Sequence, residues 1–350
     1  MMQMTESCST RPLAPVVSSA GSAIGTIASM AAEPCGEPSV AQGSPAVVAE
    51  ISAGLLARRP HISPKYLYDT LGSRLFEAIC ELDEYYPTRT EAGIFAQHGE
   101  AIAACVGQGA SLIDLGAGNC AKAASLFPLL RPQQYVPLDI SAEFLSAAVA
   151  GLQQRFPAIA MTPLGVDFSA GFQLPEHVHQ QRRVFFYPGS SIGNFSPPQA
   201  VALLRNLRAN LGADGGLLIG FDLVKQSSVL DAAYNDALGV TAAFNLNLLR
   251  HVNRLAGANF ELRQWQHCAY FDEAASRIEM HLQALCDVSV RWQGGVRQFA
   301  RGERIHTEDS YKYTRHGMCQ LLDSAGFEEV QYWTDPAGWF AVLYARAVSQ

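Results

Sequence analysis

Apolar positions recur with two different periods along the chain, and their alternation predicts an α/β fold. Short, almost wholly apolar runs are typical of strands buried on both faces, whereas apolar residues spaced three and four apart are typical of helices. Both patterns alternate between residues 91 and 223, which predicts a mostly parallel sheet with helices on both faces. The strands are expected at residues 111–116, 135–140, 158–168, 184–187 and 215–223.

Local signals mark three of the expected helices between these strands. Residues 121–130 follow a glycine turn, Ser141 is expected to cap the next helix, and Ser196 with two prolines opens another. A further helical pattern at residues 91–107 precedes the first strand. These helices have the length that parallel crossovers need.

The regular alternation of strand and helix patterns stops after Leu223, which predicts an inserted α+β domain over residues 225–313. Long helical patterns there give way to strand-like alternation, and the sheet resumes afterwards. The turn Pro336-Ala337-Gly338 is too short for a parallel crossover, so the last two strands are expected to be antiparallel. The later elements are expected as a helix at residues 316–325 and strands at 277–284, 288–292, 328–333 and 339–345.

Composition narrows the class of protein. The 350-residue chain has a net charge of -7, which offers no basic field for nucleic acid, and it has no apolar run of the ~20 residues that span a membrane. Its eight cysteines are scattered, which favours a reduced, cytoplasmic protein, and its nine histidines lack metal-ligand spacing, so no metal is expected. Residues 1–46, rich in Ser, Ala, Gly and Pro, are expected to be a disordered extension.

A glycine turn, Gly116-Ala117-Gly118, follows the first expected strand and predicts a site for an adenosine-containing cofactor. Asp139, at the end of the second strand, is placed to bind a ribose. NAD and S-adenosylmethionine both fit these features. Asp114 within the first strand, Asp167-Phe168 after the third, and the antiparallel hairpin favour S-adenosylmethionine, with an NAD-dependent oxidoreductase as an alternative.

Longer motifs follow one another in order along the chain. They include Pro64-Lys65-Tyr66-Leu67-Tyr68-Asp69, Gly72-Ser73-x-Leu75-Phe76, Glu84-Tyr85-Tyr86-Pro87-Thr88-Arg89-Thr90-Glu91, Gly193-Asn194, Asp222-Leu223-Val224-Lys225, Ala233-Tyr234-x-Asp236, Gly239-Val240-Thr241-Ala242-Ala243-Phe244-Asn245, Ile278-Glu279-Met280 and Thr307-Glu308-x-Ser310-x-Lys312. Over about residues 50–350, these segments resemble the histidine Nα-methyltransferase family of ergothioneine biosynthesis.

The resemblance implies an S-adenosylmethionine-dependent enzyme that trimethylates the α-amine of L-histidine to hercynine. It implies a Rossmann-like core at residues 91–224 and 314–350 and a substrate-binding domain at residues 47–90 and 225–313. A monomer is expected. The implied cofactor contacts are Gly116, Lys122, Asp139, Asp167 and Phe168. The implied substrate contacts are Tyr85, Asn194, Tyr234, Met280, Glu308 and Ser310, with Tyr68 and Ser191 near the reacting amine.

These residue types suit methyl transfer to an amine, which needs orientation and exclusion of water. Asn194 and Tyr234 offer neutral donors to a carboxylate, and Tyr68 or Tyr85 can face a growing positive charge. Small residues around Ser191 leave room for successive methyl groups. Tyr68 and bulk water are both candidate acceptors of the amine proton.

Glu308 and Ser310 are expected to select the substrate. Residues two apart on a strand share a face, so a carboxylate and a hydroxyl can bracket the two nitrogens of an imidazole. Another aromatic amino acid such as tryptophan is the alternative substrate, although an indole offers a single N–H. A non-catalytic sensor of amino acid or cofactor is the alternative from another class.

Overall fold

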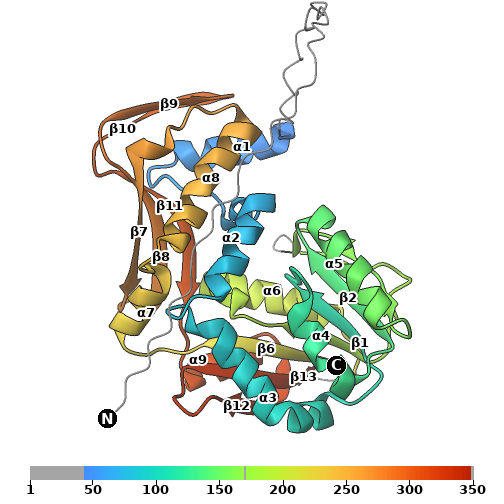
Figure 1. The fold of residues 1–350 in the computed structure, drawn as a ribbon. Coiled ribbons are helices and arrows are strands. Elements are labelled where there is room, and N and C mark those ends of the chain that lie inside the picture. Colours follow the sequence, from blue (N-terminus) through green and yellow to red (C-terminus); the bar gives the residue numbers. More distant parts are fainter. Residues whose placement is uncertain (1–42, 169–170, 348–350) are drawn as a thin grey trace, which may run out of the picture. The chain divides into compact units, whose positions relative to one another are not determined.

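The computed structural model describes residues 43–168 and 171–347, and its elements follow the predicted order (Figure 1). The helices are α1 (Pro45–Leu56), α2 (Thr70–Cys80), α3 (Tyr86–Val106), α4 (Ala121–Leu130), α5 (Ala142–Arg155), α6 (Pro197–Ala209), α7 (Ser227–Tyr234), α8 (Val240–Ala256) and α9 (Arg315–Ser324), with short 3-10 helices η1 (Pro64–Leu67), η3 (Ser191–Asn194) and η4 (Leu262–Gln264). The strands are β1 (Ser111–Leu115), β2 (Gln134–Asp139), β3 (Ala160–Met161), β4 (Leu164–Gly165), β5 (Arg183–Tyr187), β6 (Gly216–Asp222), β7 (Trp265–Asp272), β8 (Arg277–Ala284), β9 (Val288–Trp292), β10 (Gly295–Phe299), β11 (Arg304–Tyr311), β12 (Phe327–Thr334) and β13 (Phe340–Ala347).

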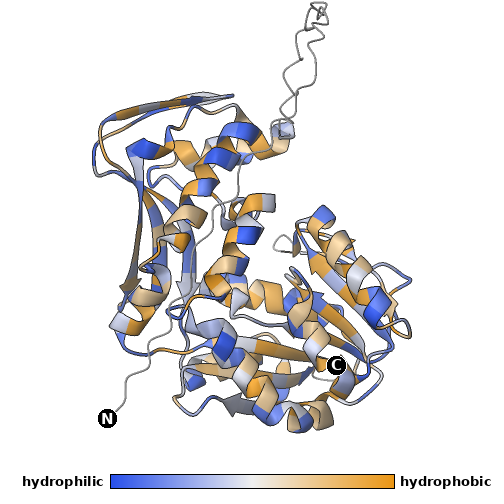
Figure 2. Ribbon diagram, viewed as in Figure 1, coloured by the Kyte–Doolittle hydropathy of each residue, from blue (hydrophilic) through white to orange (hydrophobic). Residues whose placement is uncertain are grey.

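A mostly parallel sheet forms the core, as the alternating pattern predicts. Within the described residues its order is β12-β13-β6-β5-β1-β2-β3, with β4 also beside β2. Strand β13 is antiparallel to both β6 and β12, so the expected antiparallel last pair is confirmed. Buried apolar residues cover both faces of this sheet, and Figure 2 shows hydrophobic residues along β6.

The predicted third strand is wrong as a single element. Residues 158–168 contain two short strands, β3 and β4, each paired with β2. Pro163 lies between them and has no N–H to continue the ladder. The break leaves Asp167 and Phe168 beyond the end of β4.

The two expected serine caps differ in the structure. Ser141 is the N-cap of α5, but its side chain makes no capping hydrogen bond, and its backbone N–H donates to Asp139 Oδ1 at 2.9 Å. Ser196 precedes α6, and its N–H donates to Gln199 Oε1 at 3.0 Å in a capping box. The Ser141 side chain therefore adds no hydrogen bond to the helix end, and its backbone N–H contributes to the turn after β2.

A second apolar core forms from two segments that lie far apart in the sequence. Its buried members come from residues 51–86 and 230–305. Figure 1 shows α1 and α2 (blue) near α8 (gold) and the antiparallel strands β7 to β11. Helix α3 begins at Tyr86 in this core and continues to Ile94 and Ile102 against the large sheet, so the boundary expected at residue 90 falls inside one helix.

The N-terminal extension expected over residues 1–46 lies mostly outside the described residues. Its last two residues lie in α1, which begins at Pro45. Across residues 43–168 and 171–347, none of the helices has the length and apolar character needed to cross a membrane.

Candidate active site

One cavity of about 50 Å³ is lined by residues from both cores. All eight residues expected to contact or face the substrate line it, and they come from segments more than 200 positions apart. The expected residues are Tyr68, Tyr85, Ser191, Asn194, Tyr234, Met280, Glu308 and Ser310.

A β-bulge in β11 sets the direction of Glu308 and Ser310. The register with β8 shifts between His306 and Glu308, so Thr307 is an extra residue. Ile305 faces the apolar core before the bulge, and Glu308 and Ser310 are buried on that same side after it. The shared face of the last two residues was predictable from spacing, whereas the shift at Thr307 was not.

Glu308 is held by a residue from the other side of the cavity. Asn194 Nδ2, at the end of η3, donates to Glu308 Oε1 at 3.0 Å. Burial raises the pKa of Glu308 to about 7, although Lys312 opposes that shift. The carboxyl group therefore titrates near neutral pH.

Ser310 and Tyr234 form a second polar pair. The Tyr234 hydroxyl donates to Ser310 Oγ at 2.8 Å, and both side chains are buried. Lys312 donates to both hydroxyl oxygens, at 2.8 Å to Ser310 and 3.1 Å to Tyr234. Lys312 belongs to the motif quoted above, but the sequence assigned it no contact.

Aromatic rings form the apolar part of the cavity. Tyr68 contacts Phe76 and Phe244 edge to face, with centroids 5.6 Å and 5.5 Å apart, and Tyr85 contacts Phe76 and Tyr234 in the same way. Phe76 and Phe244 were missed as lining residues, although both stand inside the quoted motifs. Burial raises the pKa of Tyr68 and of Tyr85 well above the ordinary value, so both phenols stay protonated.

The residues expected to hold the cofactor lie at the carboxyl ends of β1, β2 and β4. Gly116 and Gly118 have φ values of +68° and +52°, and a Cβ added to either would meet no heavy atom within 4 Å. Open space therefore adjoins this turn, and a ligand can approach the backbone there. Asp139 Oδ2 accepts the Gly118 N–H at 3.0 Å, and the carboxylate has further lone pairs that can accept hydrogen bonds.

Lys122 joins this turn to the cavity. Its ammonium lies 2.6 Å from Glu91 Oε2, and the other Glu91 oxygen accepts the Gly189 N–H at 2.8 Å. Glu91 is a buried carboxylate that the sequence did not single out. It fixes both Lys122 and the cavity-lining loop at Gly189.

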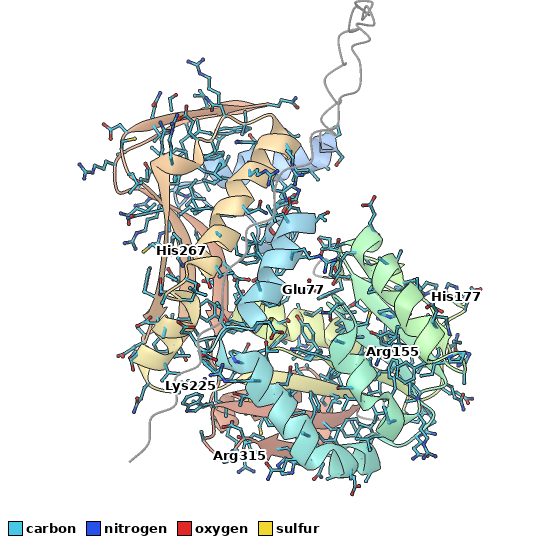
Figure 3. All side chains as sticks on the ribbon, in the orientation of Figure 1. Glu77, Arg155, His177, Lys225, His267 and Arg315 are labelled. Atoms are coloured by element: carbon cyan, nitrogen blue, oxygen red, sulfur yellow. The ribbon has the colours of Figure 1, made fainter. Side chains whose placement is uncertain are left out.

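Asp167 and Phe168 also border this region. Lys65 Nζ lies 3.5 Å from Asp167 Oδ2, and the Phe168 ring meets Tyr187 edge to face at 6.0 Å. On the other side of the turn, Asn119 Nδ2 donates to Glu77 Oε1 at 3.0 Å, which ties the turn to α2 (Glu77 is labelled in Figure 3).

Asp114 lies within the first strand, as expected. Its side chain is buried within β1, where Oδ2 accepts the Tyr135 hydroxyl at 2.7 Å and Oδ1 has no partner among the described residues. Burial raises the pKa of Asp114 to about 7. In the described part of the chain, no cluster of three or more His, Cys, Asp or Glu side chains is arranged to hold a metal ion.

Three relatives align with most of this chain. A histidine N-alpha-methyltransferase of Mycolicibacterium smegmatis is 37% identical over 302 residues, covering 85% of this chain and 93% of that protein. The protein of that name from Mycobacterium tuberculosis is 36% identical over 305 residues, covering 85% and 93%. Ergothioneine biosynthesis protein 1 of Neurospora crassa is 31% identical over 290 residues, covering 79% of this chain and 32% of that longer protein.

The family model described as a SAM-dependent, histidine-specific methyltransferase matches residues 47–347, which include both cores and every lining residue of the cavity. With relatives above 30% identity across most of its length, the chain belongs to this family of S-adenosylmethionine-dependent methyltransferases.

Proposed function

We propose that this enzyme trimethylates the α-amino group of L-histidine, giving hercynine, in the first step of ergothioneine biosynthesis. The observation that carries the proposal is the placement of Glu308 and Ser310 together in one buried, aromatic cavity. An imidazole has two ring nitrogens that can pair with these two groups. Membership of a SAM-dependent enzyme family removes the NAD alternative and the non-catalytic sensor.

The residues at the glycine turn fit S-adenosylmethionine. We assign its contacts to the space beside Gly116, to Asp139 for the ribose, to Lys122 for a carboxylate, and to Asp167 and Phe168 for the adenine. When bound, the cofactor supplies an electrophilic methyl group. The protein then has to hold a neutral amine in line with that group and keep water away.

Asn194 and the small residues after β5 are assigned to positioning the amino-acid backbone. One hydrogen of Asn194 Nδ2 is bonded to Glu308, and we assign the second to the substrate carboxylate. Ser191 opens η3, and its hydroxyl donates to Pro188 O at 3.3 Å, which keeps this lining segment compact. Space near the amine is needed because three methyl groups are added in turn.

Tyr68 and Tyr85 are assigned to stabilising positive charge through their ring faces, since the product is a quaternary ammonium. Their raised pKa values support this role, because a protonated phenol cannot accept the proton of the amine. Bulk water between methylation steps is therefore the proton acceptor in this proposal.

We further propose that residues 47–90 and 225–313 form the substrate-binding domain, and residues 91–224 and 314–350 the methyltransferase core. The separate apolar core built from residues 51–86 and 230–305 supports this division. A cytoplasmic monomer that acts on free histidine, without nucleic acid or membrane, completes the proposal.

Tryptophan is the alternative substrate, because it carries the same α-amino group that would be methylated. An indole has one N–H and no ring acceptor, so it leaves Ser310 unpaired in a buried site, which costs binding free energy. Calorimetry with S-adenosylhomocysteine present separates the two: we expect histidine to bind at least 100-fold more tightly, and tighter tryptophan binding overturns the proposed substrate.

A further inference from the structure

Lys312 is a buried cation that no step above uses. Its ammonium contacts three acceptors: Asp222 Oδ2 at 2.8 Å, Ser310 Oγ at 2.8 Å and the Tyr234 hydroxyl at 3.1 Å. An ammonium has three N–H donors, so these contacts use all of them. Lys312 does not line the cavity in the described part of the chain, so its hydrogen bonds reach a ligand only through the two hydroxyl groups.

The charge of Lys312 is stabilised from behind by Asp222. Burial by itself lowers the pKa of Lys312, but Asp222 and Tyr234 outweigh burial and raise it above the ordinary value. Lys312 is therefore a permanent donor. Both hydroxyl oxygens that it contacts have one lone pair occupied by its N–H groups.

The number of hydrogens and lone pairs decides whether the hydroxyl groups of Tyr234 and Ser310 can donate to a ligand or accept from it. Each hydroxyl has one hydrogen and two lone pairs, and the bond between Tyr234 and Ser310 uses one hydrogen and one lone pair. A phenol is the stronger donor and the weaker acceptor of the two, so Tyr234 donates to Ser310. Ser310 Oγ then accepts from both Tyr234 and Lys312, and only its own hydrogen is left for a ligand.

We propose that Lys312 is a positioning residue that makes Ser310 an obligate donor, so that the site takes the neutral imidazole with an unprotonated nitrogen facing Ser310. This inference rests on the proposed function. The second ring nitrogen then carries the hydrogen that Glu308 accepts. The tautomer of the bound ring is thereby selected, and a ring without an acceptor nitrogen leaves the Ser310 hydrogen unpaired.

Lys225 provides a matched control for Lys312. It lies on the other side of the same carboxylate, 2.5 Å from Asp222 Oδ1 and 2.7 Å from the Tyr86 hydroxyl, and its side chain is also largely buried (Lys225 is labelled in Figure 3). Lys225 contacts neither hydroxyl of the pair. Either lysine can be replaced by methionine while the other stays paired with Asp222, so neither change leaves an uncompensated buried carboxylate.

The test compares wild type, Lys312→Met and Lys225→Met by calorimetry with S-adenosylhomocysteine present. The ligands are histidine and its two pyrrole isosteres, pyrrol-2-ylalanine and pyrrol-3-ylalanine, which keep a ring N–H and lack the acceptor nitrogen. We expect the preference for histidine over both isosteres to fall by about tenfold or more in Lys312→Met, because Ser310 can then turn its hydrogen to Tyr234. We expect it to change by less than twofold in Lys225→Met.

An unchanged preference in Lys312→Met, or an equal loss in both variants, overturns the role of Lys312 and leaves the proposed function standing. Failure of the wild type to bind histidine overturns the proposed function and the inference with it. If Lys312→Met does not fold, nitrogen-15 NMR of ring-labelled histidine bound to the wild type decides. One protonated and one unprotonated nitrogen in a single tautomer support the inference, and a doubly protonated or tautomer-averaged ring overturns it.

Discussion

Asn194 Nδ2 and Glu308 Oε1 lie 3.0 Å apart and join the loop after β5 to the bulged strand β11. The two residues are separated by 114 positions in the sequence. Their hydrogen bond fixes one carboxylate oxygen and turns the remaining lone pairs of Glu308 toward the cavity. Glu308, which is assigned to ring recognition, is thereby held by Asn194 of η3, which is also assigned to the substrate carboxylate.

Glu308→Ala is expected to raise the KM for histidine at least tenfold and to favour bulkier rings such as indole, because it removes an acceptor and opens space. Asp309→Ala is the matched control. Asp309 precedes Ser310 on the opposite face of β11, where its carboxylate bonds His306 Nε2 at 2.9 Å. Steady-state kinetics with both amino acids checks this, and equal effects of the two changes would refute the assigned role of Glu308.

Stability should depend on pH through Glu308. Burial raises its folded-state pKa from 4.5 to about 7, so the ionised form destabilises the fold. The contribution of the protonated carboxyl is fully present below pH 4.5 and is lost as the pH rises through about 7. Glu308→Gln is therefore expected to be stabilising at pH 8 by up to about 3 kcal/mol, since one pKa unit corresponds to about 1.4 kcal/mol.

Thermal unfolding of wild type and Glu308→Gln without ligands, at pH 4 and pH 8, measures this effect. The difference in melting temperature should favour the variant at pH 8 and nearly vanish at pH 4. A variant that is less stable than the wild type at pH 8 contradicts the raised pKa.

The sequence predicts most of the core because burial there follows from local pattern. The strand over residues 111–116 and the helix over residues 121–130 match β1 and α4 closely. The third strand was misjudged because apolar character continues past Pro163, which interrupts the ladder. Helix α3 starts at Tyr86, five residues earlier than its periodicity indicates, because Pro87 is tolerated in the first turn and Tyr86 packs into the second apolar core.

The sequence predicts which residues line the site, but it predicts few of the hydrogen bonds and ion pairs that connect them. Spacing places Glu308 and Ser310 on one face, but it cannot show that Lys312 reaches Asp222, which is 90 positions away in the chain. Glu91 likewise reaches Lys122, 31 positions away, and Gly189, 98 positions away. Tertiary contacts decide which partners a buried charged residue has. The local hydrophobic pattern carries no information about those contacts.

Gly118→Ala is expected to weaken binding of S-adenosylhomocysteine at least tenfold. The φ of +52° makes a side chain costly there by about 1–2 kcal/mol, and the added methyl group enters the open space beside the turn. Gly151→Ala, in the interior of α5, is the control, because the new Cβ also meets no atom but the helix favours alanine. Calorimetry should show unchanged cofactor affinity in Gly151→Ala. Normal affinity in Gly118→Ala would argue against the turn as the cofactor site.

Glu91→Gln is expected to reduce affinity for S-adenosylhomocysteine five- to tenfold, because Lys122 loses its carboxylate partner and the loop at Gly189 loses a charged acceptor. Glu100→Gln, on the exposed side of the same helix, should have no effect. The affinities are measured by calorimetry, with melting temperature as the check on folding. Equal affinities in the two variants would show that Glu91 supports the fold without positioning Lys122.

The most direct test of the proposed function is mass spectrometry of histidine incubated with the enzyme and S-adenosylmethionine, with tryptophan as a competing substrate in the same mixture. We predict that histidine gains three methyl groups on its α-nitrogen and that tryptophan stays unmodified. Unchanged histidine, or methylation of tryptophan in its place, would contradict the proposed function.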